Sequence, residues 1–210
     1  LVAAIGIELP IHEPRGNMVI DIGGGTTDVG VISLGGIVSS RNARIAGDRF
    51  NEDIIGHIRN EFKLLIGEKT AEDVKIAVAS MTPARERIET IARGRDVVTG
   101  LPREMVITDH DVRNAIGHSI EELVEAVKEV LERTPPEILA DVMQDGVYLA
   151  GGGALIRGLP EFLQESLGVP VVVAPDPLTA VARGTGIVLS DLETYREALL
   201  KNDEELVPTE

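Results

Sequence analysis

The stretch MVIDIGGGTTDVGVISLGG, residues 18–36, decides how the first part of this 210-residue chain folds. Apolar residues predict one strand over 18–22 and a second over 27–33, with the glycines between them. An ordinary hairpin turn needs one glycine or an Asn-Gly pair, whereas this turn has three glycines in a row. Glycine has no Cβ, so a run of glycines costs conformational entropy but lets a ligand approach the backbone. We therefore expect a ligand-binding turn between two paired strands.

The side chains around this first glycine turn are typical of a site for magnesium and phosphate. Backbone N–H groups in such a turn can surround an anion. An aspartate at the end of a strand can hold a hydrated divalent cation, and two threonines add hydroxyl groups. The predicted phosphate-binding residues are Asp21, Gly23, Gly24, Gly25, Thr26 and Thr27, with Asp21 also holding Mg²⁺ through water. The alternative is a purely structural turn in which Asp21 bonds to its own backbone.

A second glycine turn occurs in YLAGGGALIRGL, residues 148–159, and it also follows an apolar strand and precedes a helix. Phosphate is favoured at helix N-termini, but bare backbone equally admits a base or a ribose. Neither turn matches GxxxxGK[ST] or GxGxxG. Two such turns in one chain favour nucleotide binding, and the second would supply Gly151, Gly152, Gly153, Ala154 and Leu155. The alternative for Gly152 is a left-handed turn residue with no ligand.

Composition and charge exclude several classes of function. The chain has no cysteine, which excludes disulfides, thiolate metal sites and a cysteine nucleophile. Its net charge of -15 opposes binding to nucleic acid, since phosphate backbones would be repelled. No run of 18 apolar residues and no signal segment is present, so we expect a cytoplasmic protein without direct membrane contact in this part. Residues 191–210 read as an acidic, solvated tail.

The order of predicted elements favours a mixed sheet with helices on both faces, because consecutive strands are followed by alternating strands and helices. Strands are expected at 18–22, 27–33, 37–45, 146–150 and 169–174, and a hairpin around 100–102. Helices are expected at 1–6, from an N-cap at Asp48 to Leu65, from a cap at Thr70, from Asp109 or Asp111 to Pro135, over 160–167, and from a cap at Asp176. The helix that ends at Pro135 has a predicted apolar stripe of Val112, Ile116, Ile120, Leu123, Val127 and Leu131. Small residues in the last helix suit close packing: Ala180, Gly184 and Ser190.

Glu72 and Lys75 lie three residues apart on one predicted helix and therefore share a face. Spacing alone supports a surface ion pair as well as it supports a functional pair. The four histidines have no metal-ligand spacing, and no serine has a local base partner for a nucleophilic triad.

Five segments together resemble the MreB family, the bacterial actin homologues that set rod shape. They are DIGGGTTDVGVISLGGIV, AGDRFNEDII, LLIGEKTAEDVK, GRDVVTGLP and LAGGGALIRGL, and the resemblance runs from Leu1 to about Leu192. It implies an α/β fold: an actin-like ATPase domain with a ribonuclease-H-like mixed sheet and a small inserted α+β lobe. The implied parts are 1–66 with the phosphate loop, 67–109 as the inserted lobe, 110–190 with the adenosine loop, and the tail 191–210.

The resemblance also implies a function that composition and spacing do not give. ATP with Mg²⁺ would bind between two domains, Thr26 would position the attacking water, and Glu72 and Lys75 would flank the nucleoside. The partners would be further copies in a filament, an N-terminal domain and cell-shape membrane proteins, with filaments at the inner face of the membrane. The family's N-terminal domain and catalytic Glu would precede Leu1, so we expect a fragment or truncated product that binds weakly and hydrolyses little.

Two other functions stay open at this point. The chain could be the nucleotide-binding half of another member of the actin and sugar kinase superfamily, because the first glycine turn fits that whole group. It could also be a non-catalytic, truncated interaction domain, because the residues that would distinguish it lie outside this sequence.

Overall fold

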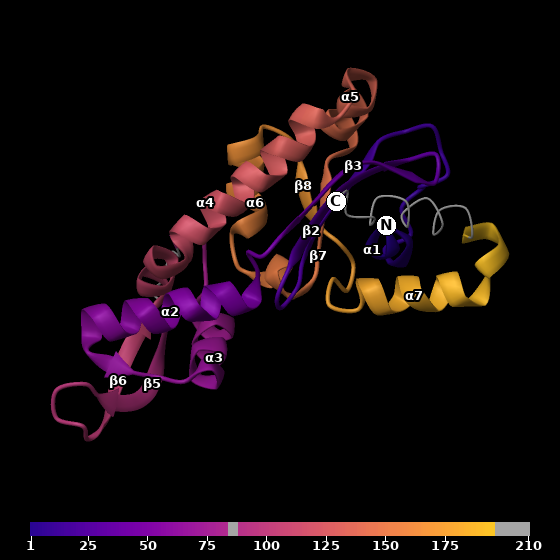
Figure 1. Cartoon of the computed structure of the whole chain (residues 1–210). Coiled ribbons are helices and arrows are strands. Elements are labelled where there is room, and N and C mark those ends of the chain that lie inside the picture. Colours follow the sequence, from indigo (N-terminus) through magenta and orange to yellow (C-terminus); the bar gives the residue numbers. More distant parts are fainter. Residues whose placement is uncertain (84–87, 196–210) are drawn as a thin grey trace, which may run out of the picture.

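The computed structural model describes residues 1–83 and 88–195, and a five-stranded mixed sheet forms its centre (Figure 1). The strand order is β3-β2-β1-β7-β8. Its strands are β1 (Asn17–Ile22), β2 (Thr27–Ser33), β3 (Gly36–Ala43), β7 (Val147–Ala150) and β8 (Val171–Val173). β1, β2 and β3 are antiparallel neighbours, whereas β7 and β8 continue the sheet parallel to β1. The predicted mixed sheet is therefore confirmed.

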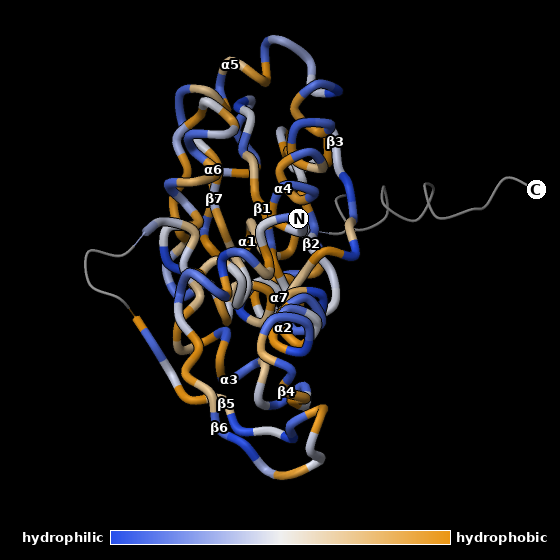
Figure 2. Tube along the Cα trace, turned by 90° about the vertical axis from the view of Figure 1, so that its left-hand side faces the viewer, coloured by the Kyte–Doolittle hydropathy of each residue, from blue (hydrophilic) through white to orange (hydrophobic). Residues whose placement is uncertain are grey.

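Helices cover both faces of this sheet, also as predicted, because its central strand is apolar on both sides. Met18, Ile20 and Ile22 of β1 belong to a larger core, and Val19 belongs to a smaller one. The larger core is closed by α2 (Gly47–Phe62), α4 (Asp109–Arg133), α5 (Pro136–Asp145) and α6 (Leu159–Leu167), and the smaller by α1 (Val2–Gly6) and α7 (Ala180–Ser190). Hydrophobic segments along β1 and β7 run through the interior in Figure 2.

Helices α1 and α7 pack closely through small residues. A Cβ added to Gly6 would lie 1.8 Å from the Ala180 carbonyl oxygen, and one added to Gly184 would lie 2.0 Å from the Val2 carbonyl oxygen. The expectation of close packing is confirmed at Ala180 and Gly184. It is wrong at Ser190, which is exposed at the end of α7.

A second, three-stranded sheet of order β4-β5-β6 projects from the main body and carries α3 (Glu68–Val78) against it (Figure 1). Its strands are β4 (Leu64–Leu65), β5 (Glu89–Asp96) and β6 (Pro102–Thr108), which confirms the hairpin around residues 100–102. Leu65 was expected on the preceding helix, and this is wrong. α2 ends at Phe62 because Lys63 has the left-handed conformation, with φ 53°.

The three expected N-caps, Asp48, Thr70 and Asp176, are wrong. α2 begins at Gly47 after Ala46, α3 at Glu68 after Gly67, and α7 at Ala180 after Thr179, none with a side-chain cap. At α2 the N–H groups of Gly47 and Asp48 bond instead to the carbonyls of Gly23 and Gly24, at 3.1 and 2.7 Å. Tertiary hydrogen bonds thus satisfy the first N–H groups of α2, which a capping side chain would satisfy in an isolated helix. Asp176 has φ +45° and belongs to a turn.

The long helix α4 follows the prediction closely. Five of the six residues in its predicted apolar stripe are buried, Val112, Ile116, Ile120, Leu123 and Val127, whereas Leu131 is only partly buried. It begins at Asp109 with a capping box between Thr108 and Asp111. The helix α5 that follows is absent from the prediction, because Pro135 and Pro136 indicate the end of a helix, whereas Pro136 also starts α5.

The predicted division into 1–66, 67–109, 110–190 and 191–210 stays a prediction. β4 lies just before the boundary at 67 and pairs with β5. Residues 196–210 of the predicted tail lie outside the described residues.

Candidate functional site

A cleft of ≈ 770 Å³ opens where the two glycine turns, the start of α2, α3 and the start of α7 meet. Both glycine turns follow strands that lie side by side and run in parallel, β1 and β7. Parallel neighbours place their carboxyl ends at one edge of the sheet, and this edge is where α/β proteins commonly bind ligands. The predicted residues that line the cleft are Asp21, Gly23, Gly24, Glu72, Lys75, Gly151, Gly152, Gly153 and Leu155.

Four predicted site residues lie beside the cleft without lining it. Gly25 and Thr26 are exposed at the far end of the first turn. Thr27 is fully buried, and its hydroxyl donates a hydrogen bond to the Ile45 carbonyl at 2.5 Å. Ala154 is 2% exposed and packs in the core. Their roles in binding stay predictions.

Half of the residues that line the cleft lie outside the predicted site. The additional residues are Gly47, Asp48, Phe50, Ile76, Ala79, Ile156, Pro177, Leu178 and Val181. Ile76 lies four residues after Glu72 on α3, so helical spacing could have found it. Pro177, Leu178 and Val181 come from a distant segment, and no local pattern marks them.

The first glycine turn presents free backbone N–H groups. It is closed by a hydrogen bond from the Gly23 N–H to the Thr26 carbonyl, at 2.9 Å. Its own carbonyls at Gly23 and Gly24 point to the start of α2 and accept hydrogen bonds there. Within residues 1–83 and 88–195, the N–H groups of Gly24, Gly25 and Thr26 find no acceptor. A Cβ at Gly24 would meet nothing within 4 Å, so an anion has access to these donors.

The second glycine turn is packed more tightly. Gly151 has φ +79°, and a Cβ there would lie 2.3 Å from the Ile22 carbonyl oxygen. A Cβ added to Gly153 would lie even closer to a neighbour, 2.2 Å from Ile22 Cγ2. Gly152 opens the short 3₁₀ helix η1 (Gly152–Leu155) without a positive φ, and its nearest neighbour would be Leu178 Cδ2 at 3.4 Å. The left-handed turn residue is therefore Gly151, and Gly152 is the one glycine of this turn with room for a side chain on the cleft side.

The carboxylate of Glu72 is held by two donors across the cleft from these turns. Lys75 Nζ lies 2.6 Å and Asn51 Nδ2 lies 2.8 Å from Glu72 Oε2. Burial alone would raise the pKa of Glu72, but these hydrogen bonds bring that pKa below its usual range. Lys75 Nζ also donates to the Gly47 carbonyl at 3.0 Å. Glu72 is therefore an ionised acceptor at neutral pH.

Asp21 is the group that fits a cation. Burial, and then the neighbouring charge of Asp28, raises the pKa of the Asp21 carboxyl. A cation beside it would relieve both effects. Within the described residues no cluster of three acidic or histidine side chains could hold a metal by itself. One carboxylate together with water and ligand phosphates is nevertheless a donor set that Mg²⁺ accepts, so the residues present fit Mg²⁺ delivered with a phosphate ligand.

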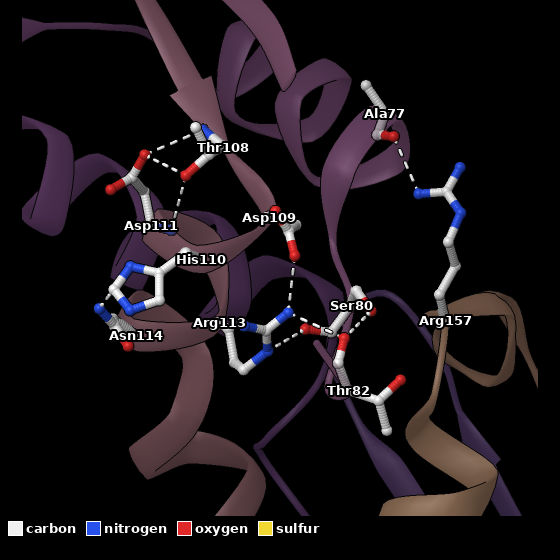
Figure 3. A network of polar contacts seen from close by, with 10 residues as sticks. All are labelled: Ala77, Ser80, Thr82, Thr108, Asp109, His110, Asp111, Arg113, Asn114 and Arg157. Carbon is white, nitrogen blue, oxygen red and sulfur yellow. Dashed lines mark hydrogen bonds and ion pairs between the residues drawn. The ribbon is translucent and has the colours of Figure 1, made fainter. Parts of the chain in front are cut away.

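A polar network fixes α3 against the rest of the site (Figure 3). The Arg113 guanidinium donates to the carbonyls of Ser80 and Thr82, at 2.9 and 2.8 Å, and to Asp109 Oδ2 at 2.8 Å. Arg157, just beyond the second glycine turn, donates to the Ala77 carbonyl at 2.9 Å. The network ties the end of α3 to α4 and to the second turn, so the helix that bears Glu72 and Lys75 has a fixed place.

Comparisons of the sequence agree on one family. The sequence profile of the MreB/Mbl protein family matches residues 1–197. Cell shape-determining protein Mbl of Bacillus subtilis (strain 168) is 51% identical over 192 residues, covering 91% of this chain and 58% of the relative. Cell shape-determining protein MreB of Escherichia coli (strain K12) is 46% identical over 195 residues, covering 93% of this chain and 56% of the relative. The chain thus spans less than two thirds of each.

Comparisons of the structure agree with the sequence. MreB5 of Spiroplasma citri bound to ADP superposes with a TM-score of 0.89 at 40% identity, over 93% of this chain and 60% of that protein. A MamK double helical filament has a TM-score of 0.74 at 23% identity, over 90% of this chain and 57% of that one, which shows the fold alone. Among residues 1–83 and 88–195, no helix combines the length and apolarity needed to span a membrane.

Proposed function

Because the chain belongs to the MreB/Mbl family, we propose that it is the C-terminal part of an actin-like protein that binds ATP and polymerises into filaments controlling bacterial cell shape. The observation that carries this proposal is the cleft in which two glycine turns and the Glu72–Lys75 pair converge. The relative MreB5 binds ADP in one structure and AMPPNP in another, which supports a nucleotide as the ligand.

Each part of the cleft suits one part of ATP. The free N–H groups of the first glycine turn suit the β- and γ-phosphates, since such groups surround anions without needing positive side chains. Asp21 would hold Mg²⁺ through water, and the ion would neutralise phosphate charge in a chain whose net charge is -15. Thr26, exposed at the end of the turn, would position the attacking water for hydrolysis.

The opposite end of the cleft suits adenosine. Apolar side chains that remain exposed there, Ile76, Leu155, Leu178 and Val181, would be covered by a base. Gly152 would allow the ligand to approach the backbone, and Glu72 would accept a hydrogen bond from it.

Assembly and location follow from the same proposal. The protein would associate with further copies of itself, as MamK does in its double helical filament. ATP would lie between this part and an N-terminal domain, and the filaments would form in the cytoplasm at the inner face of the membrane, together with cell-shape membrane proteins. No contact with nucleic acid is expected.

The proposal is tested by calorimetric titration with Mg-ATP, first with this chain and then with the chain extended to the length of its relatives. We expect weak binding to the chain and tighter, Mg²⁺-dependent binding to the extended protein, followed by sedimentation of filaments. Filament docking without any nucleotide binding would instead support a non-catalytic interaction domain. Phosphorylation of a small molecule would support a kinase of the same superfamily.

A further inference from the structure

Asn51 is a buried polar residue next to the cleft that does not line it. It lies on the inner side of α2 and is 7% exposed. Its Nδ2 donates to Glu72 Oε2 at 2.8 Å, and because a carboxylate only accepts, the amide nitrogen must face Glu72. Its Oδ1 is buried and finds no donor in the part of the chain that the structure describes. A buried amide with one orphaned atom is unfavourable, so a reason other than stability is needed for its presence.

The two oxygens of Glu72 have different surroundings. Oε2 accepts from both Asn51 and Lys75, whereas Oε1 accepts no hydrogen bond from the described residues. The Glu72 side chain is 43% exposed and lines the cleft. Two donors on one oxygen fix the plane of the carboxylate, and the free oxygen is left as an acceptor for a ligand.

The same contacts reach the first glycine turn through Gly47. Lys75 Nζ bonds to the Gly47 carbonyl, and the Gly47 N–H bonds to the Gly23 carbonyl, at 3.0 and 3.1 Å. A Cβ at Gly47 would lie 3.3 Å from Lys75 Nζ and 3.4 Å from the Gly23 oxygen, so the contact leaves little room. These contacts fix the position of Glu72 relative to the first glycine turn, which would bind the phosphates.

We propose that Asn51 is a positioning residue that, together with Lys75, holds Glu72 Oε2 so that Glu72 Oε1 meets a hydrogen-bond donor of the nucleoside. The donor is the ribose 2′-hydroxyl or the exocyclic amine of the base, since both donate to a carboxylate oxygen. This inference rests on the proposed function, because it requires a nucleotide in the cleft. Asn51 itself does not touch the ligand; it acts through Glu72.

The test measures selectivity, which a merely structural role would not change. Mg-ATP, 2′-deoxy-ATP and inosine triphosphate are titrated into the extended protein, wild type and Asn51→Leu. Wild type should prefer ATP over whichever analogue lacks the donor: the deoxynucleotide if the donor is the ribose hydroxyl, inosine triphosphate if it is the amine. Asn51→Leu should reduce that preference about tenfold, the value of one hydrogen bond to a charged group. Asn60→Leu, an exposed change on the same helix, should reduce nothing.

A double-mutant cycle with Glu72→Gln separates action through Glu72 from a general effect on folding. In the Glu72→Gln background, Asn51→Leu should cause no further loss of selectivity. Asn51→Ser, which keeps a small polar side chain but is too short to reach Glu72, serves the same cycle if the leucine variant does not fold.

Three results would overturn this inference while leaving ATP binding intact. The Asn51 variants could keep the preference of the wild type for ATP, the losses of selectivity in the cycle could be additive, or the wild type could bind both analogues as tightly as ATP. A wild type that binds no ATP at all would overturn the proposed function and this inference together.

Discussion

At the first glycine turn, residues 23–25, added Cβ atoms would meet little, whereas at the second, residues 151–153, two of the three would overlap Ile22. Gly24 has open space around it and free N–H groups beside it. All three glycines of the second turn line the cleft, but Gly151 and Gly153 are required by backbone conformation and packing, and only Gly152 has room for a side chain. Identical glycine runs thus have different surroundings: open backbone with free N–H groups at the first turn, which suits the proposed ligand, and close contact between two neighbouring strand ends at the second.

The largest expected effect concerns stability at the second turn. Gly151→Ala places a Cβ 2.3 Å from the Ile22 carbonyl oxygen on a residue with φ +79°. Backbone strain of about 1–2 kcal/mol and overpacking of about 1–3 kcal/mol should lower the free energy of unfolding by roughly 3 kcal/mol. Gly24→Ala, the matched change in the first turn, should stay within about 0.5 kcal/mol of wild type. Urea denaturation of the chain measures both, and equal losses at the two turns would remove the distinction between them.

The next effect tests Gly152, the one glycine of the second turn that has room for a side chain. Gly152→Val should fold normally, because its nearest neighbour, Leu178, is 65% exposed and free to move aside. It should nevertheless block the ligand. In the extended protein, Mg-ATP at a concentration of 100 Kd should raise the free energy of unfolding of the wild type by about 2.7 kcal/mol. Gly152→Val should not show this increase.

Thermal melts with and without Mg-ATP provide the measurement for Gly152→Val. A variant that melts early without ligand but keeps the full increment would place Gly152 with Gly151 and Gly153 as a structural glycine. The second turn would then have no role in nucleotide binding.

A smaller effect is expected from the cation contact beside the first turn. Asp21→Ala should weaken Mg²⁺-dependent ATP binding by about 1.5–3 kcal/mol, roughly ten- to a hundredfold in affinity, because a charge-assisted contact is lost. Folding should change little, since Asp21 ends a strand and is not part of either core. Calorimetric titration of the extended protein decides, and equal affinities for variant and wild type would leave Asp21 as a turn residue only.

The smallest effect is a pH dependence of stability without ligand. Burial, followed by Asp28 directly across the β1–β2 pair, raises the pKa of Asp21 above its ordinary 3.8. As pH rises from 3.8 through this raised pKa, the unfolded chain ionises first, so the folded state loses stability. At neutral pH, Asp21→Asn should therefore be more stable than wild type by roughly 0.2–1 kcal/mol, the cost of opposed like charges.

The advantage of Asp21→Asn should disappear below pH 3.8, where the carboxyl is protonated in both states. Urea midpoints of wild type and variant across this range check the sign. A difference in urea midpoint that stays constant with pH would mean that ionised Asp21 does not destabilise the folded state. It would also weaken the assignment of Asp21 as the cation-binding residue of the first turn.

Local patterns were sufficient for most elements. The predicted range 27–33 matches β2 to the residue, and five of the six residues in the predicted apolar stripe of α4 are buried, because strand and helix periodicity are properties of a short segment. Helix starts failed where tertiary contacts replaced local signals. The first N–H groups of α2 bond to the first glycine turn, so Asp48 had no capping role to play.

The sequence by itself determined that two glycine turns, an aspartate and a Glu–Lys pair were present at the ends of predicted strands and on one helix face. Only the tertiary structure decided that β1 and β7 are parallel neighbours, which brings those turns to one edge of the sheet. It also decided which glycines are free and which are packed, and that Asn51 holds Glu72. The physical reason is range: turn chemistry and periodicity act over a few residues, whereas the packing around Ile22 and the contacts of Glu72 join segments that are remote in the chain.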